Sequence, residues 1–249
     1  MSPEQEDALI DLLRQVKEVL DEHNVEFWLD CGTLLGAVRD GKFIAWEHDI
    51  DLGSWCEKVP ETVEISVSKA LCDRGFKVWI AENHMSTKRE DDLCADINFY
   101  RLINDQAIKP TLFPKNLFGK FLRAWLPALW APYHPRRVSK IKSPVKRFIV
   151  KNLINISRAM PSLLRERLAQ IVSAVYEKIG SEDVPWIVPS RYFSDLSTMR
   201  FYGMEFKVPA ETEGYLAYRY GEGWRTPRTD WETVRDDGAC QFRGVSRKS

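Results

Sequence analysis

The chain begins with a helical pattern of apolar residues. Ser2-Pro3-Glu4-Gln5 has the order of a capping box with proline at the first helical position. Apolar residues then recur at intervals of three and four positions: Leu9, Leu12, Leu13, Val16, Val19 and Leu20. This spacing predicts an amphipathic helix over residues 3–23.

Short apolar segments follow this helix. The pattern predicts a strand at 25–29, a turn at Gly32-Thr33, a brief helix at 34–39 and a second strand at 49–53. The chain thus returns to an apolar strand directly after the polar loop that precedes residue 49.

A second helix and two more strands come next. The residues predict a helix over 61–74 that Gly75 ends, a strand over 76–81, a polar loop over 82–92 and a strand over 93–100. This order, with further strands after it, predicts an α+β fold in which helices back a mixed β-sheet.

The middle of the chain has a different character. Residues 117–137 are aromatic, interrupted by prolines and free of acids, and residues 136–151 contain seven basic residues and no acid. An amphipathic segment beside a polybasic one is typical of a peripheral membrane contact. A lid over a substrate and an ordinary helical core are the alternatives. We treat 105–180 as a basic, partly helical insertion in a single domain of residues 1–249 that ends in a helical segment.

Charge divides the chain in the same way. Residues 101–180 carry 16 Lys and Arg against three acids, an excess of 13, although the whole chain has a net charge of zero. Such a block suits phosphates, anionic lipid or nucleic acid, whereas the acidic remainder suits cations. Solvated helix faces would produce the same imbalance.

Three features that the sequence lacks bear on the cellular compartment of the protein. It has no run of 18 uncharged apolar residues, and its first residues do not have the layout of a signal peptide. Its five cysteines contain no C-x-x-C pair, which argues against a disulfide framework and a structural zinc site. We expect a cytoplasmic protein, with contact at the inner face of the membrane left open.

The second strand carries two acids. Asp49 and Asp51 stand two residues apart, so they point to the same face with Cα atoms about 6.6 Å apart, whereas Ile50 points to the core. Two such carboxylates repel each other unless a cation compensates them, and paired metals are a known device for clamping phosphoryl groups. Oxygen ligands favour Mg²⁺ or Mn²⁺ over zinc.

Other residues fit a phosphate site beside this pair. Gly32 and Thr33 stand where a helix N-terminus would offer backbone N–H groups to phosphate. Arg39 lies within reach of a bidentate phosphate contact. Asp96, on a later strand, is a candidate third carboxylate. Each signal is weak alone, and the combination is much more specific.

The motifs resemble those of a known family. Residues 28–53, WLDCGTLLGAVRDGKFIAWEHDIDLG, are similar to the signature of the LicD family, which includes fukutin and fukutin-related protein, within the nucleotidyltransferase-fold superfamily. DINFY at 96–100 resembles the family's later acidic strand, and 201–231 its C-terminal segment, in which a Val-Pro turn precedes a helix ending in Y-G-x-x-W-x-x-P. The basic middle has no clear counterpart. Glu47 and His48 stand where relatives often have aspartates, which puts an accessory acidic role at position 48 in doubt.

The resemblance implies a nucleotidyltransferase-like fold and a metal-dependent transferase. Such an enzyme moves phosphocholine or a polyol phosphate from a CDP-activated alcohol to a sugar hydroxyl of a glycan or glycolipid and releases CMP. By the same resemblance Asp49 and Asp51 would be metal ligands, and Asp96 a further ligand or the catalytic base. Gly32 and Thr33 would line the phosphate seat. The implied partners are a CDP-alcohol donor and a glycan or lipid-linked sugar acceptor.

The C-terminal aromatic and basic residues have two interpretations. Tyr220 and Trp224 would stack on the cytosine or shape the acceptor groove, or else belong to the core. Three arginines would bind phosphate or an anionic acceptor, or else form surface ion pairs: Arg219, Arg225 and Arg228.

Two other functions stay open at this level. The same fold would also serve a nucleotidyltransferase with an NTP donor. A regulatory module bound to a membrane through 117–151, with an inactive site, is the other alternative, although an unused acidic pair would cost stability. We do not expect nucleic-acid binding, because no recognised binding motif surrounds the basic block.

Overall fold

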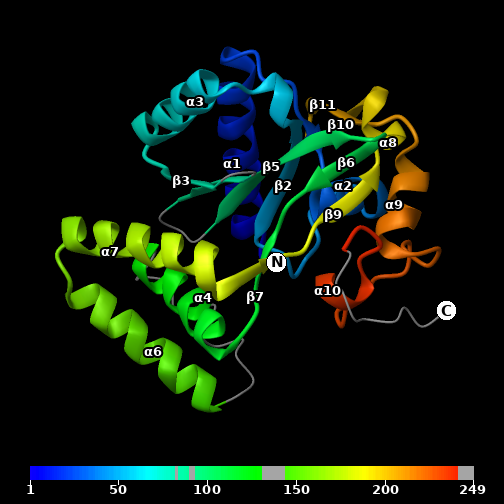
Figure 1. Ribbon diagram of the computed structural model, residues 1–249. Helices are drawn as coiled ribbons and strands as arrows, with labels where there is room; N and C mark the ends of the chain where they lie inside the picture. The colour runs from blue at the N-terminus through cyan, green and yellow to red at the C-terminus, as the bar shows by residue number, and fades with distance from the viewer. Residues whose placement is uncertain (82–83, 90–92, 131–143, 241–249) are drawn as a thin grey trace. The chain divides into compact units, whose positions relative to one another are not determined.

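The structure, a computed structural model, describes residues 1–81, 84–89, 93–130 and 144–240. The chain divides into two compact units (Figure 1). The first consists of Met1–Pro110 and Pro185–Ser249, and the second of Thr111–Val184. The second unit overlaps residues 105–180, the segment that the sequence predicts to be a basic insertion.

The first unit is built on a nine-stranded sheet in its described residues. The main strand order is β10-β11-β1-β2-β5-β4-β3, and β6 pairs with both β5 and β9. The pairs β1–β11 and β2–β5 are parallel and the others antiparallel, which confirms the predicted mixed sheet. The strands are β1 Trp28–Leu29, β2 Asp49–Trp55, β3 Lys77–Ala81, β4 His84–Lys88, β5 Cys94–Ile103, β6 Gln106–Lys109, β9 Trp186–Pro189, β10 Leu196–Phe201 and β11 Met204–Pro209.

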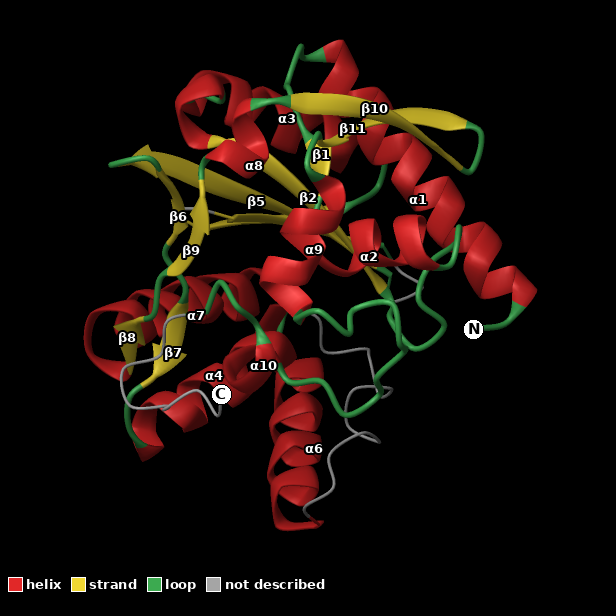
Figure 2. Ribbon diagram, turned by 90° about the vertical axis from the view of Figure 1, so that its right-hand side faces the viewer, coloured by secondary structure: helices red, strands yellow, loops and turns green. Residues whose placement is uncertain are grey.

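Helices back this sheet. Helices α1 and α3 lie over one face, and α2 and α9 lie on the other side of it (Figure 2). Helix α1 confirms the predicted N-terminal helix and its capping box, because the Ser2 hydroxyl accepts the Gln5 N–H while the Gln5 side chain accepts the Ser2 N–H. The helices are α1 Pro3–Glu22, α2 Cys31–Arg39, α3 Glu61–Asp73, α8 Arg191–Ser194, α9 Thr212–Tyr220 and α10 Thr233–Asp236, with a 3₁₀ turn at Cys56–Lys58.

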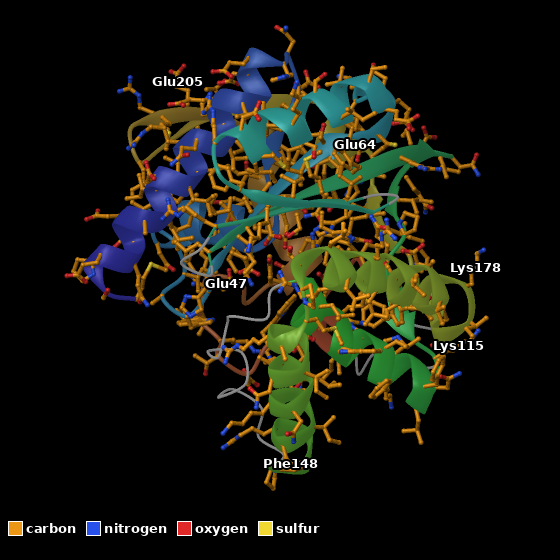
Figure 3. The ribbon with its side chains drawn as sticks, turned by 90° about the vertical axis from the view of Figure 1, so that its left-hand side faces the viewer. Glu47, Glu64, Lys115, Phe148, Lys178 and Glu205 are labelled. Atoms are coloured by element: carbon orange, nitrogen blue, oxygen red, sulfur yellow. The ribbon has the colours of Figure 1, made fainter. Side chains whose placement is uncertain are left out.

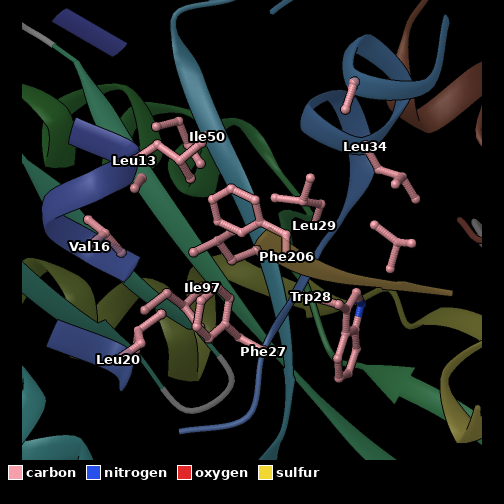
Figure 4. Close-up of a cluster of buried hydrophobic side chains, with 14 of the residues drawn as sticks. Leu13, Val16, Leu20, Phe27, Trp28, Leu29, Leu34, Ile50, Ile97 and Phe206 are labelled. Atoms are coloured by element: carbon pink, nitrogen blue, oxygen red, sulfur yellow. The ribbon is translucent and has the colours of Figure 1, made fainter. Parts of the chain in front are cut away.

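The core extends over both faces of the sheet, and one part of it lies between α1 and the sheet (Figure 4). Ile50 is fully buried there, as its alternation with the two acids predicts. On the opposite face of β2 the indole of Trp28 packs directly on Gly53. A Cβ at Gly53 would lie 2.3 Å from Trp28 Nε1, so this position has no room for a side chain. Burial thus fixes which face of β2 carries Asp49 and Asp51.

Two local predictions are wrong. Gly32 and Thr33 do not form a turn before the helix but lie in the first turn of α2, because Asp30 caps that helix directly. The loop predicted over 82–92 contains strand β4, whose polar residues pair with β5 and β3. Tertiary pairing overrides weak local strand preference here. Residues 82–83 and 90–92 of that segment lie outside the described residues.

The second unit is mainly helical. Helix α4 contacts both α6 and α7, and strands β7 and β8 pair beside them. Its elements are α4 Leu117–Trp130, α6 Pro144–Ala159, α7 Ser162–Val175, a π-helical turn at Tyr176–Gly180, β7 Leu112–Pro114 and β8 Ser181–Asp183. Part of the basic stretch singled out in the sequence, residues 131–143, lies outside the described residues.

Candidate metal and phosphate site

Parallel pairing of β2 with β5 brings the predicted acids together. Asp51 stands opposite Asp96, and Asp49 stands opposite Cys94. Partners aligned across adjacent strands point to the same face of the sheet. The ligand atoms of Asp49, Cys94 and Asp96 all lie within 4.8 Å of one another, a grouping that could hold a metal ion.

Asp51 lies among other acids. Burial raises the pKa of Asp51 well above its usual range, and the negative charges of Asp49, Asp96, Asp30 and Glu47 raise it further. A carboxylate with so much negative charge around it is stable in its ionised form only when a cation balances it. The electrostatics of this face therefore favour a bound cation.

Asp96 has the opposite balance. Burial by itself would raise its pKa, but side-chain hydrogen bonds to His84 and Ser86 and the charge of Lys109 leave the pKa of Asp96 below its usual value. Its Oδ1 is buried and lies 3.4 Å from His84 Nε2, within ion-pair distance. A buried carboxylate whose pKa stays low is suited to be a metal ligand.

Gly32 admits a further carboxyl group to the site. A Cβ at Gly32 would lie 2.1 Å from Glu47 Oε2, so only glycine lets Glu47 approach the first turn of α2. Burial, together with the charge of Asp49, raises the pKa of Glu47 to about 7, and Arg39 opposes this rise. The acidic side chain at position 47 is thus part of the site.

Thr33 links α2 to the acidic strand. Its hydroxyl oxygen accepts the backbone N–H of Asp51 at 2.8 Å, and its side chain is buried. The start of α2, where we expect phosphate, is therefore fixed directly against the strand that carries the predicted metal ligands.

A buried network of hydrogen bonds around Asp30 also fixes the start of α2. Cys31 begins α2 with φ +45°, and Asp30 accepts its N–H at 2.8 Å. The hydroxyl groups of Tyr100 and Tyr215 also donate to Asp30, the former at 2.8 Å. Arg219 Nη1 lies 3.8 Å from the same carboxylate. These contacts keep a fully buried acid paired.

Arg219 is an internal residue. It donates two hydrogen bonds to Asp237, of 2.7 and 2.5 Å, and one of 2.8 Å to the Tyr215 hydroxyl. Only 1% of Arg219 is exposed. One of the two interpretations drawn from the sequence, that Arg219 forms a surface ion pair, is therefore wrong. Its guanidinium forms a buried pair with the Asp237 carboxylate.

Lys109 is a second buried cation. Its Nζ donates to Asn98 Oδ1 at 2.6 Å and lies 4.0 Å from the centre of the Trp186 ring. Burial lowers the pKa of Lys109, while the charges of Cys31, Asp30 and Asp51 oppose this change. Lys109 therefore offsets part of the negative charge of the acidic cluster.

The predicted phosphate ligand Arg39 has a neighbour in its own chain. Its Nε and Nη2 donate to the two carboxylate oxygens of Asp40 at 3.0 and 2.7 Å, and its side chain is largely buried. A guanidinium has five donors, so this pair leaves others for a substrate.

The C-terminal candidates lie in different surroundings. Tyr220 packs against Trp231 with ring centres 5.0 Å apart and the rings tilted by 44°. Burial chiefly raises the pKa of its phenol, and the charge of Glu47 raises it further. Trp224 is packed in the main core. Arg225 is exposed, pairs with Glu213 at 2.6 Å and lies over the Trp224 ring. Of the three, Tyr220 is the one whose pKa is affected by an acid of the cluster.

Sequence reasoning missed several residues of this site. Cys94 and Asn98 could have been found by alternation, since they share the face of Asp96 on one strand. Asp30 could have been found as the residue before a helix start. Lys109 and Asp237 carry no local signal, because only the folding of the chain brings them to the cluster.

The fold and the site together define a class of domain. A mixed sheet presents converging carboxylates beside a helix N-terminus, an arrangement suited to binding a cation and a phosphate group together. Residues 24–139 match the family model described as LicD/FKTN/FKRP, nucleotidyltransferase domain. That segment is thus a LicD-family domain, which confirms the resemblance and the nucleotidyltransferase-like fold expected from the sequence.

Curated relatives match over shorter stretches. Ribitol 5-phosphate transferase FKRP of Mus musculus is 40% identical over 75 residues, which are 29% of this chain and 15% of that protein. Ribitol-5-phosphate transferase FKTN of Macaca fascicularis is 29% identical over 124 residues, 46% of this chain and 27% of that protein. The matches thus span less than a third of either relative. A solved structure of the lincosamide antibiotic adenylyltransferase LnuA has a TM-score of 0.36 at 13% identity, covering 88% of this chain and 85% of that one.

Proposed function

We propose that this chain is a metal-dependent transferase of a phosphorylated alcohol, such as phosphocholine or ribitol phosphate. The donor would be a CDP-alcohol, the acceptor a sugar hydroxyl on a glycan or glycolipid, and the leaving group CMP. The observation that carries this proposal is the convergence of Asp49, Asp51 and Asp96 on one face of the sheet beside the start of α2. The family match and the ribitol-phosphate transferase relatives support it.

The residues present fit a divalent cation. The ligand atoms of Asp49, Cys94 and Asp96 lie within 4.8 Å of one another, and Asp51 adds a carboxylate that needs a positive partner. Mg²⁺ or Mn²⁺ suits the carboxylate oxygens. When bound, such an ion neutralises charge on the diphosphate of the donor. Because a ligand atom of Asp96 lies within 4.8 Å of those of Asp49 and Cys94, and because the pKa of Asp96 is below its usual value, we assign it as a ligand rather than as the base.

The remaining residues position the donor. The first turn of α2, held by Thr33 and Asp30, directs backbone N–H groups toward the phosphates. Arg39 is placed to add a charged hydrogen bond from the donors that Asp40 leaves free. Tyr220 is our candidate for an aromatic contact with the donor, because the charge of Glu47 affects the pKa of its phenol.

The reaction itself exchanges one bond to phosphorus for another. The acceptor oxygen forms a bond to the phosphorus that carries the alcohol, and the bond from this phosphorus to the bridging oxygen breaks. CMP leaves with the bridging oxygen and its electron pair. The hydroxyl proton passes to a carboxylate of the cluster, directly or through water.

A donor screen tests the proposal. Purified protein is incubated with CDP-ribitol, CDP-choline or CDP-glycerol and a panel of sugar acceptors, and CMP release is measured with Mg²⁺, with Mn²⁺ and with EDTA. We expect acceptor-dependent CMP release from one CDP-alcohol, lost in EDTA and reduced by orders of magnitude in Asp49→Asn.

The same screen separates the other functions. Parallel reactions with ATP and CTP measure pyrophosphate, and its release with nucleotide attached to the acceptor would replace our proposal with an NTP-dependent nucleotidyltransferase. Absence of turnover and of nucleotide binding by calorimetry, for all donors with metal present, would contradict both transferases and favour an inactive module.

A further inference from the structure

Exposed apolar side chains are concentrated in the second unit. Of the 16 large apolar side chains that are exposed in the described residues, 11 lie between Leu112 and Ile179. Among the described residues of that unit, the core clusters contain eight buried residues: Leu122, Leu126, Leu129, Leu153, Ile154, Ala169, Val172 and Tyr176. A surface this apolar usually marks an interaction site.

Helix α6 shows the pattern most clearly. Leu153, Ile154 and Ser157 form its buried face. The outer face presents Phe148 and Ile156, which are 69% and 51% exposed. Phe148 lies at the lower end of α6 in Figure 3. Hydrophobic burial inside the protein therefore accounts for only one of the two apolar faces of this helix.

Basic residues lie beside the exposed apolar face. Arg147, Lys151 and Arg158 project from α6 at helical spacing and are exposed, and the helix contains no acid. The whole second unit, residues 111–184, carries 14 Lys and Arg against four Asp and Glu. A protein partner would need an unusual acidic and apolar surface to match this face, whereas an anionic bilayer offers both features.

We propose that the second unit binds an anionic lipid surface through the exposed face of α6, with the apolar side chains entering the interface and the basic ones contacting head groups. No helix in the described residues is long and apolar enough to span a membrane. A contact made by the exposed apolar and basic residues of one helix is peripheral and sensitive to salt. This inference does not depend on the transferase activity.

Vesicle binding of the full chain tests the proposal. The protein is co-sedimented with vesicles of phosphatidylcholine alone or mixed with phosphatidylglycerol, at low and high salt. We expect binding to the mixed vesicles that high salt weakens, and little binding to phosphatidylcholine alone. Ile156→Glu should reduce the partition coefficient at least about tenfold, because it places a charge in the apolar contact. Neutralising Arg147, Lys151 and Arg158 together with glutamine should reduce it on the order of a hundredfold at low salt.

A matched control distinguishes binding through this face from non-specific adhesion to vesicles. Ile65 on α3 is 56% exposed, similar to Ile156, but belongs to the first unit. Ile65→Glu should bind vesicles as the wild type does, and circular dichroism should show that both variants are folded. Equal losses in the two variants, or binding that neither salt nor phosphatidylglycerol affects, would overturn the proposal. So would a dimer in sedimentation velocity that Ile156→Glu dissociates, without vesicle binding by the wild type, because the face would then bind a second copy.

Discussion

Replacing Asp51 with asparagine removes one negative charge from the acidic cluster and keeps the shape of the side chain. The contact between Thr33 and residue 51 is made by the main chain, so the variant retains it. Asp51 stands opposite Asp96 on the adjacent strand. Adjacent strands are about 4.8 Å apart, and two full charges about 5 Å apart repel by about 3 kcal/mol at an effective dielectric constant of about 20.

The pKa of Asp51 is raised, chiefly by burial and next by the neighbouring acids. Asp51 is therefore partly protonated, which limits this repulsion. We therefore expect Asp51→Asn to increase the free energy of unfolding of the metal-free protein by about 1–3 kcal/mol. Magnesium should reverse the order. A ligand at a hundred times its dissociation constant stabilises the native state by about 2.7 kcal/mol, and the variant should lose most of this gain.

Urea denaturation followed by tryptophan fluorescence, in EDTA and in Mg²⁺, measures both effects. Asp195→Asn is a suitable control, because it removes one exposed aspartate of the same unit outside the cluster. The control should match the wild type within about 0.5 kcal/mol in both buffers. If Asp51→Asn is less stable than the wild type in EDTA, or if Mg²⁺ stabilises both proteins equally, the metal assignment is wrong.

Two further variants test the surroundings of the cluster. Gly32→Ala should displace the Glu47 carboxylate. Calorimetry should then show an affinity for a CDP-alcohol that is at least about tenfold lower, with little loss of stability. Gly223→Ala is the control, because this glycine has open space around it, and it should change neither the affinity nor the stability. Unchanged affinity in Gly32→Ala would contradict the role of this glycine. Arg219→Met should cost about 3–5 kcal/mol of unfolding free energy because it leaves Asp237 buried without its partner, and adding Asp237→Asn should recover much of the loss. Additive losses in the double variant would show that the pair is not coupled.

Local periodicity was enough to predict much of the fold. The helical spacing and capping box of α1 depend on residues close together in the chain, and all six predicted apolar positions are buried. The orientation of Asp49, Ile50 and Asp51 follows from the alternation of a strand. Strand β4 was missed because its polar residues carry little local strand signal, and its hydrogen bonds come from neighbouring strands.

The face on which the acids of β2 lie was therefore determined by the sequence, since the period of a strand is a property of nearby residues. Only the tertiary structure decided which groups meet them. The register of two parallel strands sets Cys94 and Asp96 beside the pair, and Tyr215 reaches Asp30 across 185 positions of the chain. Buried charges such as Arg219 and Lys109 are tolerated only where folding supplies partners, and no short stretch of sequence specifies those partners.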